Sequence, residues 1–135
     1  MTTRPPITIS SMDLHRLEQL LDDLPANAFP GLAELEAELA RGKVAEPAEI
    51  PADAVTMNST VGFSVDGHDY TKTLVYPARL TDSEQQISVM APVGSALLGM
   101  QEGKGIDWPR PGGGTMRVRV DKIVYQPERE GELHR

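Results

Sequence analysis

The stretch Ile87-Ser88-Val89-Met90-Ala91-Pro92-Val93-Gly94-Ser95-Ala96-Leu97-Leu98-Gly99 decides the fold of this chain. Its first four residues are mainly apolar or β-branched and predict a short strand. Pro92 has a helical φ and lacks the N–H that a first helical turn leaves unpaired, so a helix is expected to begin there. Gly99 is typical of a helix end. A strand that leads directly into a short helix predicts a mixed α and β domain.

Alternating apolar residues predict strands on both sides of this stretch. Asp66-Gly67 predicts a hairpin turn, and Pro111-Gly112-Gly113-Gly114 predicts another turn before a long last strand, residues 115–126. The apolar parity of that strand changes near Asp121-Lys122, which predicts a β-bulge. The expected unit is a twisted antiparallel sheet covered by one helix. The alternating sets are Val61, Phe63 and Val65, then Tyr70, Lys72, Leu74 and Tyr76, and finally Met116, Val118 and Val120.

Leucines at helical spacing predict two helices near the N-terminus. Ser10-Ser11 offers an N-cap and Gly42 a C-cap, while Pro25 and Pro30-Gly31 separate the two helices. Short amphipathic helices joined by a turn favour an antiparallel hairpin, here a short coiled coil. With about 12 residues in each arm, the hairpin extends only ~18 to 20 Å. The leucines are Leu14, Leu17, Leu20, Leu21 and Leu24 in the first helix and Leu32, Leu35 and Leu39 in the second.

A proline-flanked connection separates the two patterns. Glu46-Pro47-Ala48-Glu49-Ile50-Pro51 cannot continue a helix, because proline removes a backbone donor and restricts the residue before it. We therefore expect an α+β protein in two parts. Residues 1–47 form the helical hairpin, and residues 48–135 form the sheet domain.

The composition argues against several functional classes. The 135 residues include no cysteine, so disulfides, thiol nucleophiles and thiolate metal sites are excluded. The net charge of −7 opposes independent binding to DNA, and residues 1–50 alone carry nine acids against four Lys or Arg. No apolar run has the length of a signal peptide or a membrane span. A cytoplasmic protein without DNA or membrane contacts of its own is expected.

The sequence contains few residues in catalytic or metal-binding patterns. His15, His68 and His134 lie far apart and are interpreted as surface residues. The aromatic residues Phe63, Tyr70, Tyr76 and Trp108 are interpreted as core, although an aromatic pocket is the alternative. Asp22 and Asp23, followed by Asn27, lie at the hairpin tip, where two carboxylates could share a divalent metal. Adjacent helical residues point about 100° apart, which favours a solvated acidic tip over a metal site. No cofactor, metal or catalytic set is predicted, and an interaction module is favoured.

The sheet domain resembles a known family. Ile87-Ser88-Val89-Met90-Ala91-Pro92-Val93, Ala96-Leu97-Leu98-Gly99 and Pro111-Gly112-Gly113 are similar to the C-terminal domain of the GreA and GreB factors. The sequence is more similar still to the Rnk family, the regulators of nucleoside diphosphate kinase. This resemblance extends over nearly the whole chain. The segments that carry this second resemblance are Val55-Thr56-Met57-Asn58-Ser59, Thr73-Leu74-Val75-Tyr76-Pro77-Ala78 and Ser88-Val89-Met90-Ala91-Pro92-Val93-Gly94.

The resemblance implies an FKBP-like fold for residues 51–135 and binding to RNA polymerase at the rim of its secondary channel. It implies that the contacting positions are Met90, Ala91 and Pro92, with Val93 and Leu97 nearby. In Gre factors a long coiled coil carries acidic residues down the channel for transcript cleavage. The hairpin here is too short, and its tip lacks their spaced acidic pair. Competition with Gre factors without stimulated cleavage is therefore expected, with an indirect effect on the kinase.

Two alternatives remain open. An FKBP-like fold also occurs in peptidyl-prolyl isomerases, although a fold alone does not confer an activity. A direct protein activator of nucleoside diphosphate kinase is the other alternative. For the helix after Pro92, Leu98 is assigned to the core, while Val93 and Leu97 are equally compatible with core and contact roles.

Overall fold

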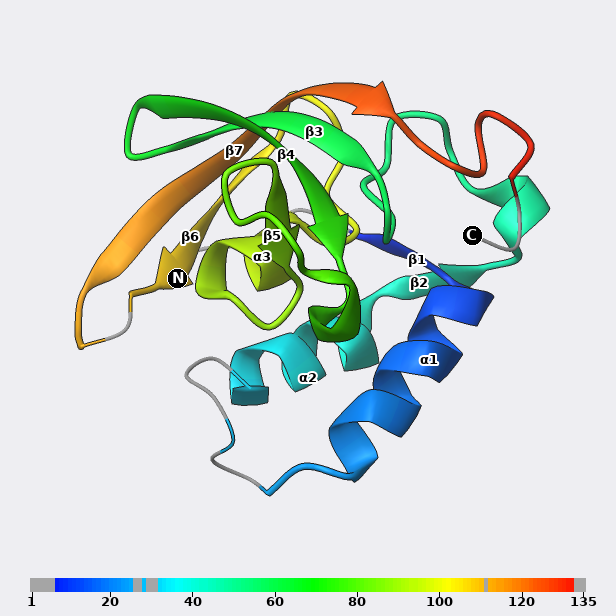
Figure 1. Ribbon diagram of the computed structural model, residues 1–135, viewed down its shortest axis with the longest axis horizontal. Helices are drawn as coiled ribbons and strands as arrows, with labels where there is room; N and C mark the ends of the chain where they lie inside the picture. The colour runs from blue at the N-terminus through cyan, green and yellow to red at the C-terminus, as the bar shows by residue number, and fades with distance from the viewer. Residues whose placement is uncertain (1–6, 26–27, 29–31, 111, 133–135) are drawn as a thin grey trace.

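The computed structural model describes residues 7–25, 28, 32–110 and 112–132. The described chain forms three α-helices, a five-stranded sheet and a small two-stranded sheet (Figure 1). The presence of both helices and sheets agrees with the predicted α+β class. In chain order they are β1 (Thr8–Ser10), α1 (Ser11–Asp22), α2 (Leu32–Arg41), β2 (Lys43–Ala45), β3 (Thr60–Val65), β4 (His68–Val75), β5 (Gln86–Ser88), α3 (Pro92–Leu97), β6 (Gly105–Pro109) and β7 (Thr115–Tyr125).

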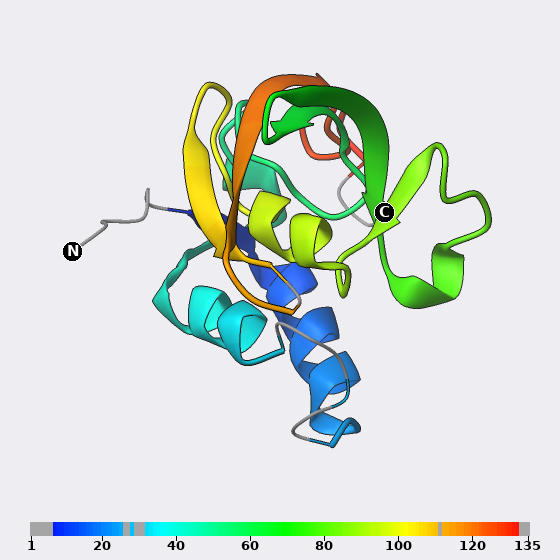
Figure 2. The ribbon, with the colours of Figure 1, turned by 90° about the vertical axis from the view of Figure 1, so that its left-hand side faces the viewer.

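The larger sheet curls over α3, as Figure 2 shows, with the strand order β5-β4-β3-β7-β6. Its strand pairs are antiparallel except for β4 and β5, which run parallel. The expectation of a wholly antiparallel sheet is therefore wrong at this pair. Residues 76–85, which include a 3-10 helix at Pro77–Arg79, carry the chain back to the start of β5. Strand β6 was not predicted, because its five residues include one aspartate and end in proline.

The predicted Asp66-Gly67 turn and the predicted bulge are both confirmed, while Pro111, the first residue of the other predicted turn, lies outside the described residues. Asp66 and Gly67 have φ values of 49° and 87°, the left-handed pair that a two-residue type I′ hairpin requires. In β7, Gly62 faces Lys122 while Phe63 faces Val120, so Asp121 is the extra residue of a bulge. Val124 is skipped in the same way between the partners of Val61 and Thr60, which the sequence pattern did not reveal.

The N-terminal helices form where the leucine pattern predicted them, except that α1 ends at Asp22 and does not include Leu24. Ser10 caps α1, because its hydroxyl accepts a hydrogen bond from the N–H of Asp13 at 3.2 Å. Gly42 follows the last residue of α2. A glycine fits there because a Cβ at this position would lie only 2.7 Å from Cδ1 of Ile9. Ile9 belongs to β1, which pairs in parallel with β2 and closes the base of the hairpin.

One hydrophobic core connects the hairpin and the sheet. Leu17 and Leu21 of α1 and the three leucines of α2 belong to the same buried cluster as α3 and the inner face of the sheet, and α2 lies against α3. The expected coiled coil is therefore not confirmed, because these leucines do not form a separate helix-to-helix seam. The division into residues 1–47 and 48–135 and the FKBP-like comparison stay predictions. Among the described residues, no helix has the length and apolar character needed to cross a membrane.

Candidate functional site

The junction between β5 and α3 is held by a dense set of backbone contacts. Ala91 is extended and precedes Pro92 in the first turn of α3, while the N–H of Ala91 donates to the carbonyl of Ser88 at 3.0 Å. The hydroxyl of Ser95 donates to the carbonyl of Val89 at 2.6 Å. Met90 donates its N–H to the hydroxyl of Ser88 at 3.1 Å. The backbone of the junction is therefore fixed before any partner binds.

Close approach of α3 to β5 depends on a glycine. A Cβ at Gly94 would lie 2.0 Å from the carbonyl oxygen of Ser88, a distance that no side chain can adopt. This contact holds the start of α3 against the end of β5. Residues 90–93 stay partly exposed beside it, whereas Leu97 and Leu98 are 1% and 3% exposed and belong to the core. The core assignment of Leu98 is confirmed. Leu97 also packs in the core and is not part of the exposed surface of the junction.

A pocket of about 190 Å³ opens beside the junction. Val93 contributes from α3, and the aromatic rings of Phe63 and Tyr70 stack with their centroids 5.6 Å apart. The ammonium of Lys72 lies 5.8 Å from the centre of the Tyr70 ring and donates to the carbonyl of Ser83 at 2.7 Å. The pocket is thus largely apolar with one cation at its margin. Its lining residues are Phe63, Val65, Tyr70, Lys72, Ile87 and Val93.

The interpretation of the aromatic residues as core is confirmed in part. Phe63 and Trp108 are buried at 2% and 0% exposure. Tyr70 is 44% exposed, so its assignment to the core is wrong, because Lys72 and the pocket leave one side of its ring open to solvent. Tyr76 is partly buried and packs against the core. The discarded pocket interpretation is therefore correct for Phe63 and Tyr70.

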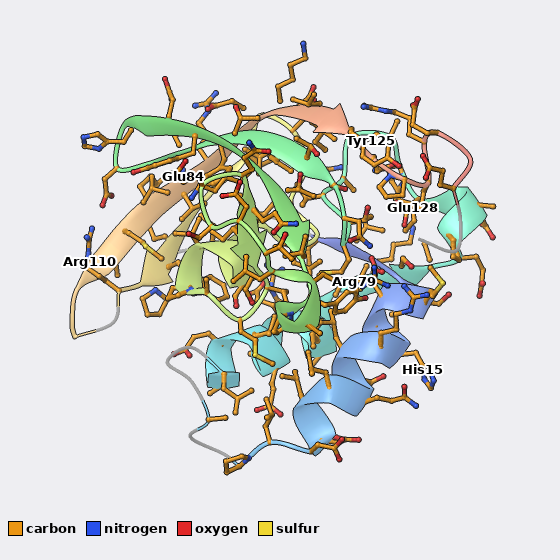
Figure 3. All side chains as sticks on the ribbon, in the orientation of Figure 1. His15, Arg79, Glu84, Arg110, Tyr125 and Glu128 are labelled. Carbon is orange, nitrogen blue, oxygen red and sulfur yellow. The ribbon has the colours of Figure 1, made fainter. Side chains whose placement is uncertain are left out.

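The predicted tip residues do not converge. Asp22 is the last residue of α1 and Asp23 is its C-cap, and both are exposed. Asn27 and His134 lie outside the described residues. Among the residues that are described, no three acidic or histidine side chains form a group able to hold a metal ion. His15 is exposed, and Figure 3 shows it on the side of α1 that faces away from α2.

A buried carboxyl joins the hairpin to the sheet domain. Asp13, in the first turn of α1, is 1% exposed and accepts the N–H of Met57 at 3.1 Å. The hydroxyl of Tyr76 donates to the other oxygen of Asp13 at 3.3 Å. Nearby, the hydroxyl of Thr56 donates to Glu128 at 2.7 Å, and Figure 3 shows Glu128 on the side of the molecule where α1 begins. The base of the hairpin is therefore attached through polar contacts as well as leucines.

Burial changes the acidity of this cluster. It raises the pKa of Asp13 from 3.8 to about 7, against the opposing effect of the Met57 hydrogen bond, and the charge of Glu128 raises it further. The same burial, with the charge of Asp13, raises the pKa of Tyr76 above its usual range. Asp13 was not among the site residues predicted from the sequence, although it stands four residues before Leu17 on the buried face of α1. A carboxyl on the apolar face of a helix indicates a polar contact inside the protein.

Two family models match successive parts of the chain. The model described as "Rnk N-terminus" matches residues 5–44. The model described as "Transcription elongation factor, GreA/GreB, C-term" matches residues 50–125, which is more than half of the sequence. The chain is a member of the Rnk family and carries a GreA/GreB domain. This family assignment confirms the resemblance found in the sequence, and it places the β5–α3 junction and the adjoining pocket within the GreA/GreB part.

Relatives agree with the assignment to the Rnk family. The "Regulator of nucleoside diphosphate kinase" of Escherichia coli strain K12 is 46% identical over 132 residues, covering 96% of this chain and 97% of its own length. "Transcription elongation factor GreA" of Listeria welshimeri is 31% identical over 95 residues, covering 69% of this chain and 59% of its own. The names of these relatives are those of a regulator and a transcription factor rather than of enzymes.

A solved structure supports the fold. The "Prokaryotic transcription elongation factor GreA/GreB from Nitrosomonas europaea" is 52% identical, with a TM-score of 0.71 over 90% of this chain and 100% of that chain. The GreA/GreB-like fold is therefore shown for this Rnk-family protein. Within the described residues, the β5–α3 junction is a partly exposed surface with a hydrogen-bonded backbone, and the apolar pocket adjoins it.

Proposed function

We propose that this protein binds RNA polymerase at the rim of the secondary channel through the β5–α3 junction, residues 90–93, and competes there with GreA and GreB. The observation that carries the proposal is the partly exposed apolar junction of a GreA/GreB domain, held in one conformation by Pro92, Gly94 and the hydrogen bond of Ser95. A preorganised backbone loses little conformational entropy when a partner binds.

The adjoining pocket extends this surface. Val93 belongs to both the junction and the pocket, and Tyr70 leaves 44% of its surface exposed on the opposite wall. Aromatic residues and Met are enriched at protein interfaces, and tyrosine is among the residues that most often contribute strongly to binding. In this proposal, Leu97 stabilises the junction from the core instead of contacting the polymerase.

The helical hairpin limits what binding achieves. Helix α1 has 12 residues and α2 has 10, so at 1.5 Å per residue the longer arm extends only ~18 Å. In this proposal the protein occupies the rim without placing carboxylates at the polymerase active centre. Occupancy without stimulated transcript cleavage makes it a competitor of the longer factors.

Competition provides the direct test. Increasing amounts of the protein should displace labelled GreA or GreB from core polymerase, with a midpoint that increases linearly with the labelled factor's concentration. A variant with Val44→Asp and Val124→Glu changes two exposed apolar residues outside the junction and should compete like the wild type. Detection of both proteins on one polymerase at saturation would mean that their sites do not overlap.

The name of the E. coli relative concerns nucleoside diphosphate kinase. We assign any effect on that kinase to altered gene expression, because the β5–α3 junction and its adjoining pocket are assigned to the polymerase in this proposal. Phosphotransfer by purified kinase should therefore be unchanged when this protein is added. A stoichiometric change in its rate would favour direct activation instead.

The pocket itself favours a second candidate, peptidyl-prolyl isomerisation, because it combines an apolar wall with the stacked rings of Phe63 and Tyr70. A tetrapeptide isomerisation assay separates the two. Activity that disappears in Tyr70→Ala would favour the isomerase, whereas polymerase binding without isomerisation supports the proposed regulator.

A further inference from the structure

A groove separates the two helices of the hairpin. Leu14 and Leu21 line it from α1, and Leu39 and Ala40 line it from α2, enclosing about 210 Å³. Leu21 and Leu39 are each 8% exposed, and Ala40 is exposed at the margin. Figures 1 and 2 show α1 and α2 next to each other, with α2 nearer to α3. The groove therefore has an apolar floor that the hairpin leaves open.

The margin of this groove is negatively charged. Glu18 and Asp22 from α1 and Glu36 from α2 also line it, and all three are exposed. Within the described part of the chain, none of these three carboxylates forms an ion pair or a side-chain hydrogen bond. No Lys or Arg lines the groove. By contrast, the buried Glu38 on the same helix is paired with Arg41 at 2.6 Å.

We propose that the groove between α1 and α2 binds a basic amphipathic helix of a partner protein. Apolar side chains of that helix enter between Leu14, Leu21 and Leu39, and its lysines or arginines lie against the surrounding carboxylates. A helix laid into an apolar groove is a recurrent mode of peptide recognition, in which apolar anchors supply affinity and complementary charge supplies orientation and a faster association.

Charge selects this occupant over others. Nucleic acids and anionic membranes are repelled by three unneutralised carboxylates. A second copy of this chain is disfavoured as well, because its net charge is −7 and residues 1–50 are the most acidic part. The site lies on the hairpin, whereas polymerase binding is assigned to the sheet domain, so the two proposals stand independently.

Binding of a synthetic helix to the full chain tests this inference. The probe is a fluorescent peptide of leucine, lysine and alanine, with leucines at helical spacing and lysines flanking them. We expect saturable binding that weakens with added salt. A scrambled peptide of the same composition should bind at least ~10-fold more weakly, because its leucines no longer form one face. Equal binding of the two peptides would overturn the proposal.

Two variants locate the site. Ala40→Trp fills the groove from an exposed position without changing charge, and should weaken binding at least ~10-fold, as should the triple variant Glu18→Lys, Asp22→Lys and Glu36→Lys. The matched control, which reverses Glu49, Asp69 and Glu84 to lysine, makes the same change in net charge at exposed positions elsewhere. Circular dichroism and urea unfolding establish that each variant is folded.

Each remaining outcome has one interpretation. Equal losses in the two triple variants would mean general electrostatic attraction and would overturn the proposal, as would unchanged binding in Ala40→Trp. Sedimentation provides a further measurement. A homodimer that Ala40→Trp dissociates would assign the groove to a second copy of the chain and exclude the basic helix as its occupant.

Discussion

The carboxyl of Asp13 accepts a hydrogen bond from the N–H of Met57 at 3.1 Å, which joins the first turn of α1 to the segment that precedes β3. The two residues are 44 positions apart in the chain. Because Asp13 is almost fully buried, this contact connects hairpin and sheet through a group whose charge is costly. Its protonation therefore affects the stability of the whole molecule.

The first prediction concerns pH. The pKa of Asp13 is raised to about 7 from 3.8, so between about pH 4 and pH 7 the folded protein retains a proton that the unfolded chain has lost. The unfolded state then binds fewer protons, and the free energy of unfolding falls as pH rises through this window, by on the order of 4 kcal/mol in total. It should level off above pH 7. Urea unfolding at a series of pH values measures this.

The variant Asp13→Asn isolates that contribution. An amide keeps the size of the side chain and can still accept from Met57, but it does not titrate. We expect the decline between pH 4 and pH 7 to disappear and stability at pH 8 to exceed that of the wild type. Asp23→Asn, which removes an exposed carboxyl from the end of the same helix, should retain the decline. An unchanged decline in Asp13→Asn would contradict the assignment.

A second prediction concerns the approach of α3 to β5. Gly94→Ala places a Cβ 2.0 Å from the carbonyl oxygen of Ser88, so the helix has to move and the free energy of unfolding should fall by about 3 kcal/mol. Gly62→Ala is the control, because the nearest atom to its Cβ would be 3.6 Å away. That variant should stay within about 0.5 kcal/mol of the wild type. Similar urea midpoints for both variants would mean that the junction is not held by this contact.

Local patterns predicted the elements, but contacts between distant segments were harder to foresee. The spacing of leucines placed α1 and α2, and the parity change in β7 located the bulge at Asp121, because both signals lie within a few residues. The parallel pairing of β4 and β5 depends on the path of residues 76–85, and the groove depends on how α1 and α2 pack. Neither is encoded in periodicity alone.

The candidate site was also predicted only in part: the junction was expected, whereas the pocket was only an alternative and Asp13 was not expected. Residues 90–93 are partly exposed, as a contact surface requires, because Pro92 and Gly94 fix the local turn. The pocket was underestimated, since stacking of Phe63 on Tyr70 could not be distinguished from core packing by alternation alone. Asp13 was missed because its partner Met57 is distant in sequence.

The third prediction tests the junction. Met90→Asp combined with Val93→Glu places two charges on the partly exposed apolar surface and should weaken binding to core polymerase at least tenfold, which corresponds to about 1.4 kcal/mol. Biolayer interferometry with immobilised polymerase measures the dissociation constant. Val44→Asp combined with Val124→Glu adds the same charge at exposed positions and should bind normally. Unchanged binding by a folded Met90 and Val93 variant would move the interface elsewhere.

The last prediction is that the protein does not stimulate transcript cleavage in a backtracked polymerase complex, even at concentrations that saturate binding. Cleavage requires metal-holding carboxylates within ångströms of the reactive phosphate, because stabilisation of the transition state depends on positioning. Asp22 and Asp23 stand at the end of an α1 helix of 12 residues, which extends only ~18 Å, and they are adjacent, so their side chains diverge by about 100°. Added concentration raises occupancy but does not lengthen the hairpin, so saturation separates reach from affinity. Asp22→Ala combined with Asp23→Ala should leave polymerase binding nearly unchanged, since that binding is assigned to the junction. A preparation free of Gre factors that shortened stalled transcripts, and lost this activity in the double variant, would show that the hairpin reaches the active centre after all.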